Sequence, residues 1–185
     1  MFFEQLIRAE TGCATYVIGS STGEALVVDP LWDIEPCLQI ARRYGASIRH
    51  IIDTHSHADH VSGGRRLAHR TGARLWLPAR ADVVYPCDRL SGGDVIEMGE
   101  VRVTVLDTPG HRPEHIAVAV ADLTRAEEPW FVLTGDSLYV GDVARPDLAV
   151  DGVAGAAVLY DSVYTTLLNL PDYVEIYPGH GAGST

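Results

Sequence analysis

The sequence predicts an α/β fold, and three observations support this class. The chain has 185 residues, a length that fits one domain with a substantial core. Short apolar runs typical of strands alternate with segments in which apolar residues recur every three or four positions, as they do in helices. No internal repeat and no low-complexity segment divides the chain. We therefore expect mixed strands and helices around one core.

The first third of the chain alternates strands and helices. Strands are expected at 14–18, 25–29 and 48–52, and helices at 33–44 and 64–70. The first helix places Ile34, Cys37 and Ala41 on one face, and Gly45 ends it. Gly72 ends the second helix in the same way.

The remainder of the chain is richer in strands. Strands are expected at 74–77, 94–97, 101–106, 116–121, 130–133 and 174–177. One long helix is expected at 151–170, because apolar residues recur there with helical spacing.

Four metal-ligand side chains follow the strand at 48–52 within a single loop. They are His55, His57, Asp59 and His60. Imidazole and carboxylate groups are ligands that zinc and iron accept. This density of ligand types directly after a strand is hard to explain by packing, so the loop indicates a metal site.

Three later loops add one ligand-type residue each, again directly after a strand. They supply His111 from Pro-Gly-His, Asp136 from Thr-Gly-Asp and His180 from a second Pro-Gly-His. Seven such residues could hold two ions with Asp136 as a bridge. In that arrangement, His55, His57 and His111 would bind one ion. The second ion would take Asp59, His60 and His180.

The four segments together resemble the metallo-β-lactamase superfamily, whose signature is His-x-His-x-Asp-His followed by a His, an Asp and a His on later loops. The order and approximate spacing match over nearly the whole chain. The resemblance implies an αββα sandwich with metal between the sheet ends. Family members continue past the last histidine. We therefore expect residues 1–185 to be one domain, and we leave open whether it is a naturally short member, is truncated at its C-terminus or is detached from a following rhodanese domain.

Within the superfamily, the chain looks most similar to the persulfide dioxygenases, including bacterial forms fused to rhodanese domains. The similar stretches are residues 54–63, 108–115, 134–138, 140–148 and 177–184. This resemblance implies one Fe(II) per chain, held by His55, His111 and Asp136, which leaves a face open to dioxygen and a thiol persulfide. The products would be sulfite and the parent thiol. His57, Asp59, His60 and His180 would then orient ligands and waters.

Two of these residues are candidates for direct catalytic roles. Asp59 is a catalytic candidate as well as a possible metal ligand, and Arg145 is the candidate for binding the thiol substrate. The Arg145 assignment follows from the resemblance, because an arginine is expected after the loop that carries Asp136.

Other functions fit parts of the same pattern. A dinuclear zinc thioester hydrolase of the glyoxalase II type would use all seven ligands, with zinc activating water for attack on the thioester carbonyl. A non-catalytic domain serving as a sulfur-transfer scaffold would be signalled by a lost ligand, and none is lost. A β-lactamase is disfavoured, because no secretion signal is indicated and Asp136 stands where the common zinc lactamases carry cysteine.

Composition narrows the choice of partners. A net charge of −11 disfavours nucleic-acid binding, which relies on lysine and arginine. No segment approaches the roughly 18 apolar residues of a membrane span, and no secretory signal is evident. The cysteines Cys13, Cys37 and Cys87 are expected to be free thiols, with Cys13 in the core. We expect a cytoplasmic enzyme whose partners are a thiol persulfide, dioxygen and a rhodanese domain or sulfurtransferase, and we leave a homo-oligomer open.

Overall fold

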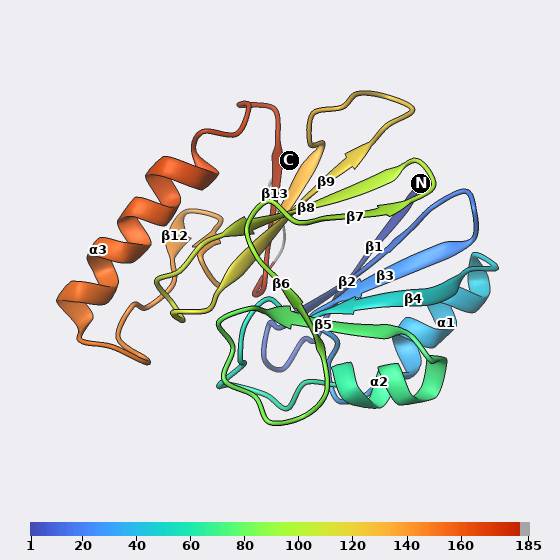
Figure 1. Cartoon of the computed structure of the whole chain (residues 1–185), viewed down its shortest axis with the longest axis horizontal. Coiled ribbons are helices and arrows are strands. Elements are labelled where there is room, and N and C mark those ends of the chain that lie inside the picture. The colour runs from blue at the N-terminus through green and yellow to red at the C-terminus, as the bar shows by residue number, and fades with distance from the viewer. Residues whose placement is uncertain (182–185) are drawn as a thin grey trace.

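Two β-sheets pack face to face in the computed structural model, and helices cover their outer faces (Figure 1). The expectation of an αββα sandwich is therefore confirmed. The structure describes residues 1–181, so residues 182–184 of the last similar stretch lie outside the described part.

The first sheet has the strand order β1-β2-β3-β4-β5-β6. Its strands are β1 (Phe2–Ile7), β2 (Ala14–Gly19), β3 (Glu24–Val28), β4 (Ser47–Ile52), β5 (Arg74–Pro78) and β6 (Asp88–Leu90). Strands β3 to β6 run parallel. The crossovers from β3 to β4 and from β4 to β5 are made by α1 (Glu35–Arg43) and α2 (Gly64–Thr71). Both helices therefore cover the outer face of this sheet (Figure 1).

The second sheet has the order β13-β10-β9-β8-β7. Its strands are β7 (Val95–Met98), β8 (Val101–Asp107), β9 (Ile116–Asp122), β10 (Phe131–Gly135) and β13 (Glu175–Pro178). Helix α3 (Gly152–Ser162) and the π-helical turn η1 (Val163–Leu167) cover its outer face. A hairpin of β11 (Leu138–Tyr139) and β12 (Asp142–Val143) forms a separate two-stranded sheet.

Side-chain size alternates along β9 because its two faces meet different layers. Val118 and Val120 point into the core between the sheets, where they pack with residues such as Tyr16 and Leu26 of the first sheet. Ala117 and Ala119 lie under α3. Small side chains on the outer face let the helix approach the sheet closely, while the branched valines fill the gap between the sheets.

Several elements differ from the sequence-based expectations. The strands β1, β6, β11 and β12 were not expected. Strand β1 lies at a sheet edge and every residue before Ile7 is half-buried, so its sequence lacks a clean alternation of buried and exposed positions. The helix expected over 151–170 is shorter, beginning at Gly152 after the N-cap Asp151 and changing to the π-helical turn at Val163. Within the described residues, no helix is long and apolar enough to cross a membrane.

The cysteines have unequal environments. Cys13 and Cys37 are buried free thiols, as expected, whereas Cys87 is only half-buried. Cys37 lies on α1 beneath the first sheet, and burial raises its pKa to about 12. Cys13 lies elsewhere, directly before β2 and beside the ligand loops.

Candidate metal centre

The loops that follow β4, β8, β10 and β13 carry all the predicted ligands, and backbone hydrogen bonds join these loops. The amide of Ile116 donates to the carbonyl of Thr54 at 3.0 Å, which links the loop after β4 to the start of β9. The amide of Gly179 donates to the carbonyl of Gly135 at 2.7 Å, which links the two parallel strands β10 and β13. The ligand residues are therefore positioned by the ends of both sheets.

His55, His111 and Asp136 form one group whose ligand atoms all lie within 4.8 Å of one another. The Nε2 atoms of His55 and His111 lie 3.9 Å and 3.6 Å from Oδ2 of Asp136. All three residues are buried. One ion with bonds of about 2 Å fits between atoms at these separations. Two imidazoles and one carboxylate are the donor set of non-heme iron sites.

Hydrogen bonds fix the tautomer of His55. The hydroxyl of Thr54 donates to Oδ2 of Asp29 at 2.8 Å, since a carboxylate only accepts. The same hydroxyl therefore accepts from Nδ1–H of His55 at 2.9 Å. This leaves the lone pair of Nε2 on the side of the triad, where Nε2 is buried and has no hydrogen-bond partner among the described residues. Such an orphaned nitrogen is costly unless a ligand satisfies it, and a metal ion would do so.

The protonation state of His55 suits the same role. Burial, followed by the charges of neighbouring histidines, holds the pKa of His55 well below its usual range. A metal-ligating imidazole must be neutral. His55 therefore fits the role of a metal ligand in both geometry and protonation.

The second histidine of the triad is oriented by a backbone carbonyl. Nδ1–H of His111 donates to the carbonyl oxygen of Arg145 at 3.1 Å, which leaves Nε2 to face Asp136. The preceding Gly110 has φ +146°, and a Cβ there would lie 2.6 Å from Cα of Leu159. The glycine of Pro-Gly-His thus lets this loop pass close to α3.

The side chain of Arg145 points to another partner. It forms a bidentate ion pair with Asp147, at 2.7 Å and 2.9 Å, and both side chains are exposed. In the structure, Arg145 therefore contacts His111 through its backbone carbonyl. The predicted contact of the Arg145 side chain with substrate stays a prediction.

The backbone of Asp136 is held by a histidine to which the sequence analysis assigned no role. The amide of Asp136 donates to Nε2 of His115 at 2.9 Å, and Nδ1–H of His115 donates to Thr108 at 2.8 Å. Burial is the main cause that lowers the pKa of His115 to about 4, so the ring is neutral and can accept. The sequence places His115 near His111 and Thr108, within the same similar stretch. A histidine outside the ligand pattern is usually structural, so the sequence analysis gave His115 no role.

Two glycines make room for Asp136. A Cβ at Gly179 would lie 2.2 Å from Oδ1 of Asp136. Gly135 has φ +50°, and a Cβ there would lie 2.6 Å from Nε2 of His115. Burial raises the pKa of Asp136, but the hydrogen bond and charge of His180, together with the charges of His111 and His115, outweigh burial and lower it. Asp136 is therefore a carboxylate ready to accept a cation.

His57 lies with different partners. Its Nε2 atom is 3.1 Å from Oδ1 of Asp29, and it forms a group of ligand atoms with Asp29 and Asp53. Burial lowers the pKa of His57, but the charge and hydrogen bond of Asp29 outweigh it and raise the pKa to about 9. The structure thus pairs His57 with a buried carboxylate and does not group its ligand atoms with those of His111.

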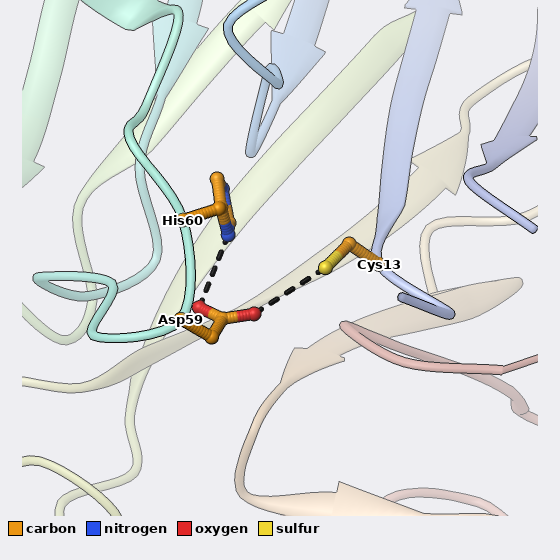
Figure 2. Close-up of side chains that lie close together, drawn as sticks. All are labelled: Cys13, Asp59 and His60. Atoms are coloured by element: carbon orange, nitrogen blue, oxygen red, sulfur yellow. Dashed lines mark hydrogen bonds and ion pairs between the residues drawn. The ribbon is translucent and has the colours of Figure 1, made fainter. Parts of the chain in front are cut away.

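The remaining predicted ligands are joined to Asp136 and to one another. Nε2 of His180 is 3.2 Å from Oδ2 of Asp136 and 3.5 Å from Oδ2 of Asp59. Nδ1 of His60 is 3.0 Å from Oδ1 of Asp59. Figure 2 shows this pair and the sulfur of Cys13, which lies 3.3 Å from Oδ2 of Asp59. The Asp136 carboxylate therefore stands between the triad and a second group of donors, which is the position of a bridging ligand.

Comparisons with known proteins place this geometry in a family. The model of the metallo-β-lactamase superfamily matches residues 8–180. A hydroxyacylglutathione hydrolase of Polaromonas sp. is 36% identical over 162 residues, which cover 86% of this chain and 58% of the hydrolase. The chain thus spans less than two thirds of that relative's length.

Persulfide dioxygenases are similar over more of the chain. The human mitochondrial persulfide dioxygenase ETHE1 is 30% identical over an alignment of 191 residues including gaps. This alignment covers 97% of this chain and 68% of the human protein. The crystal structure of ETHE1 from Myxococcus xanthus superposes with a TM-score of 0.88 at 30% identity, and the match covers 100% of this chain and 79% of that one. Because the family model matches nearly the whole length of this chain, the chain belongs to the metallo-β-lactamase superfamily.

Proposed function

We propose that this domain is a mononuclear non-heme Fe(II) dioxygenase that oxidises a low-molecular-weight thiol persulfide to sulfite and the parent thiol. The observation that carries the proposal is the division of the histidines. His55 and His111 converge with Asp136, while His57 is bound to Asp29. A donor set of two histidines and one carboxylate is typical of iron oxygenases. The dinuclear zinc arrangement would instead require His57 as a third histidine on the first ion.

The metal use itself is supported by the clusters of ligand atoms and by the family. Iron, when bound by the triad, would supply the activation of dioxygen. The protein supplies the orientation of its ligands. Asp29 and Thr54 hold His55, the carbonyl of Arg145 holds His111, and His115 holds the backbone beside Asp136.

A cleft of about 490 Å³ reaches Asp59 and His60 and is suited to the carrier part of the persulfide. Its walls include Leu31, Trp32 and Arg8, so it offers apolar surface and one cation. A small thiol that carries a carboxylate has the matching chemistry. We assign proton transfer at the reacting water to Asp59, which lies at the end of this cleft and is partly exposed.

The overall reaction balances without a further reductant. One persulfide, RSSH, one dioxygen and one water give one thiol, RSH, and one sulfurous acid, which ionises to sulfite. The sulfur–sulfur bond breaks and the terminal sulfur is oxidised, while dioxygen is reduced. The similarity to persulfide dioxygenases over 97% of the chain supports this choice of substrate.

The surroundings of the enzyme are part of the same proposal. A rhodanese domain or sulfurtransferase would produce or consume the sulfur species, and the cytoplasm would provide low-molecular-weight thiols. Arg145 is proposed to contact the carrier after release from Asp147, with which it pairs on the surface.

A dinuclear zinc thioester hydrolase is the second candidate. It is favoured by the place of the Asp136 carboxylate between the triad and His180, and by the 36% identity to a hydroxyacylglutathione hydrolase. In that function zinc would lower the pKa of a bound water to about 7. His57 would have to leave Asp29 to complete the first zinc site.

The two functions are separated by one set of assays on the same preparation. We expect about one iron per chain, oxygen uptake with glutathione persulfide or cysteine persulfide, and release of sulfite. Stoichiometric zinc, no oxygen uptake and rapid hydrolysis of S-lactoylglutathione would favour the hydrolase instead. His111→Ala should abolish iron binding, and the exposed His69→Ala is the matched control that should keep it.

A further inference from the structure

The helix that covers the second sheet carries almost no charge on its outer side. Helix α3 lies at the periphery of the molecule, and this side faces away from both sheets (Figure 1). Charged residues make up 21% of the chain, yet Asp161 is the only one in residues 152–170. A helix at a protein surface ordinarily presents a charged or polar face to water, so the outer side of α3 lacks its usual composition.

Large apolar side chains gather on the outer side of α3 and η1. Fifteen large hydrophobic residues are exposed in residues 1–181, and a third of them lie within residues 153–168. These five are Val153, Val158, Tyr160, Tyr164 and Leu168. Single exposed apolar residues are normal on a soluble domain, whereas a contiguous apolar patch marks an interaction site.

Five exposed residues form one continuous stripe along the helix. They lie three or four positions apart and are Val153, Ala157, Tyr160, Tyr164 and Leu168. Residues at this spacing line one side of a helix, and it is the spacing found where one helix packs along another. The rings of Tyr160 and Tyr164 stack with their centroids 4.2 Å apart, so the middle of the stripe presents a flat aromatic surface.

The opposite side of the helix already supplies the packing within the domain. Leu159, Val163 and Leu167 are buried in the cluster on the outer face of the second sheet. The helix is therefore apolar on two opposite sides, a pattern typical of a helix that is buried on both. The internal core accounts for one side, and the stripe is left for an external contact.

We propose that this stripe pairs with the same stripe of a second copy of the chain in a two-fold symmetric dimer. A two-fold contact uses one patch that is complementary to itself, and an uncharged apolar stripe meets this condition. The net charge of −11 makes two copies repel one another over much of their surfaces, and this repulsion is smallest where charge is absent. Asp161 is exposed beside the stripe and can stay hydrated at the rim of the contact.

The apolar area suits a small but specific dimer interface. A tyrosine side chain buries about 150–250 Å² when it is fully covered. Tyr160 and Tyr164 are 59% and 53% exposed, and Val153 and Leu168 are 82% and 54% exposed. The stripe therefore offers roughly 500 Å² per copy, and two copies would bury roughly 1,000 Å², which is the lower limit for a biological interface.

Sedimentation velocity of the 185-residue chain over a wide range of concentration tests the proposal. We expect monomer to convert to dimer and to no larger species, because a two-fold contact closes on itself. Added salt should strengthen the dimer, since it screens the repulsion between two acidic copies. A chain that stays monomeric, that grows beyond a dimer, or whose dimer dissociates in salt would overturn the proposal.

Val153→Glu and Val84→Glu are matched variants, because both valines are exposed and only Val153 lies on the stripe. Val153→Glu should raise the dissociation constant of the dimer about 100-fold or more, since the symmetry buries two unpaired carboxylates. Val84→Glu should leave the constant unchanged. A glutamate in the first turn of α3 also favours the helix, so loss of the dimer would not reflect loss of the fold.

Tyr164 provides a second pair of variants on the same stripe. Tyr164→Glu should dissociate the dimer, while Tyr164→Phe keeps the aromatic ring and should retain it. A dimer that persists at wild-type strength in both Val153→Glu and Tyr164→Glu would refute the assignment of this surface. The stripe contains no residue of the metal centre, so these outcomes do not depend on the proposed oxygenase activity.

Discussion

Thr54→Val tests whether the hydrogen bonds behind His55 control metal binding. Valine has nearly the shape of threonine, so the change removes a hydroxyl without opening a cavity. The lost hydroxyl donates to Asp29 at 2.8 Å and accepts from Nδ1 of His55 at 2.9 Å. Both contacts are buried.

The magnitude follows from those two hydrogen bonds. A hydrogen bond to a charged group contributes about 1.5–3 kcal/mol, and a buried N–H left without a partner costs about 1–3 kcal/mol. We therefore expect the free energy of unfolding of the metal-free protein to fall by about 2.5–6 kcal/mol. The affinity for iron should fall about 10–100-fold, because the tautomer and orientation of His55 are no longer fixed.

The assay pairs urea denaturation of the metal-free protein with iron competition against a chromophoric chelator. Thr71→Val is the control, because its hydroxyl donates to the carbonyl of Leu67 at 2.8 Å on α2, and it should lose stability without losing iron affinity. Thr54→Ser should keep both. A folded Thr54→Val protein that binds iron as tightly as the wild type would refute the reasoning.

Three further predictions follow from the same geometry. Burial lowers the pKa of His57, but Asp29 outweighs burial and raises this pKa to about 9. The metal-free protein should therefore lose up to about 3 kcal/mol of stability as the pH rises from about 6.5 to above about 9. Asp29→Asn should flatten this pH profile in urea denaturation. His115→Phe leaves the amide of Asp136 unpaired and should weaken iron binding about tenfold or more. Equilibrium dialysis measures this affinity, and an unchanged value would remove the positioning role of His115. Gly179→Ala places a Cβ 2.2 Å from Oδ1 of Asp136 and should abolish the binding of one iron per chain. A folded variant with full iron content would contradict this close approach.

The layered fold was predictable from the sequence because its central elements have strong periodicity. The strands at β3, β4 and β8 carry continuous or alternating apolar residues, and they lie within one or two residues of the expected ranges. The edge strand β1 and the two-residue strands β11 and β12 were missed. Strand β1 is decided by its pairing with β2, such as Phe2 opposite Gly19, which no local pattern encodes. Strands β11 and β12 pair only with each other and are too short to show a periodic pattern.

The candidate site was predictable as a set of residues but not as a set of contacts. The spacing of His55, His111 and Asp136 after strands indicated that they would converge. The spacing could not show that His57 pairs with Asp29, because Asp29 belongs to a different expected strand, 25–29, and was assigned no role in the ligand pattern. It also could not show that Cys13 meets Asp59, since that contact depends on pairing between the two ends of the chain.

The most direct test of the central claim is the stoichiometry of oxygen uptake by the iron-loaded chain with glutathione persulfide. The account predicts one dioxygen consumed and one sulfite released per persulfide, with loss of both in His111→Ala and not in His69→Ala. An iron-loaded protein that consumes no oxygen, together with a zinc-loaded protein that hydrolyses S-lactoylglutathione, would contradict it.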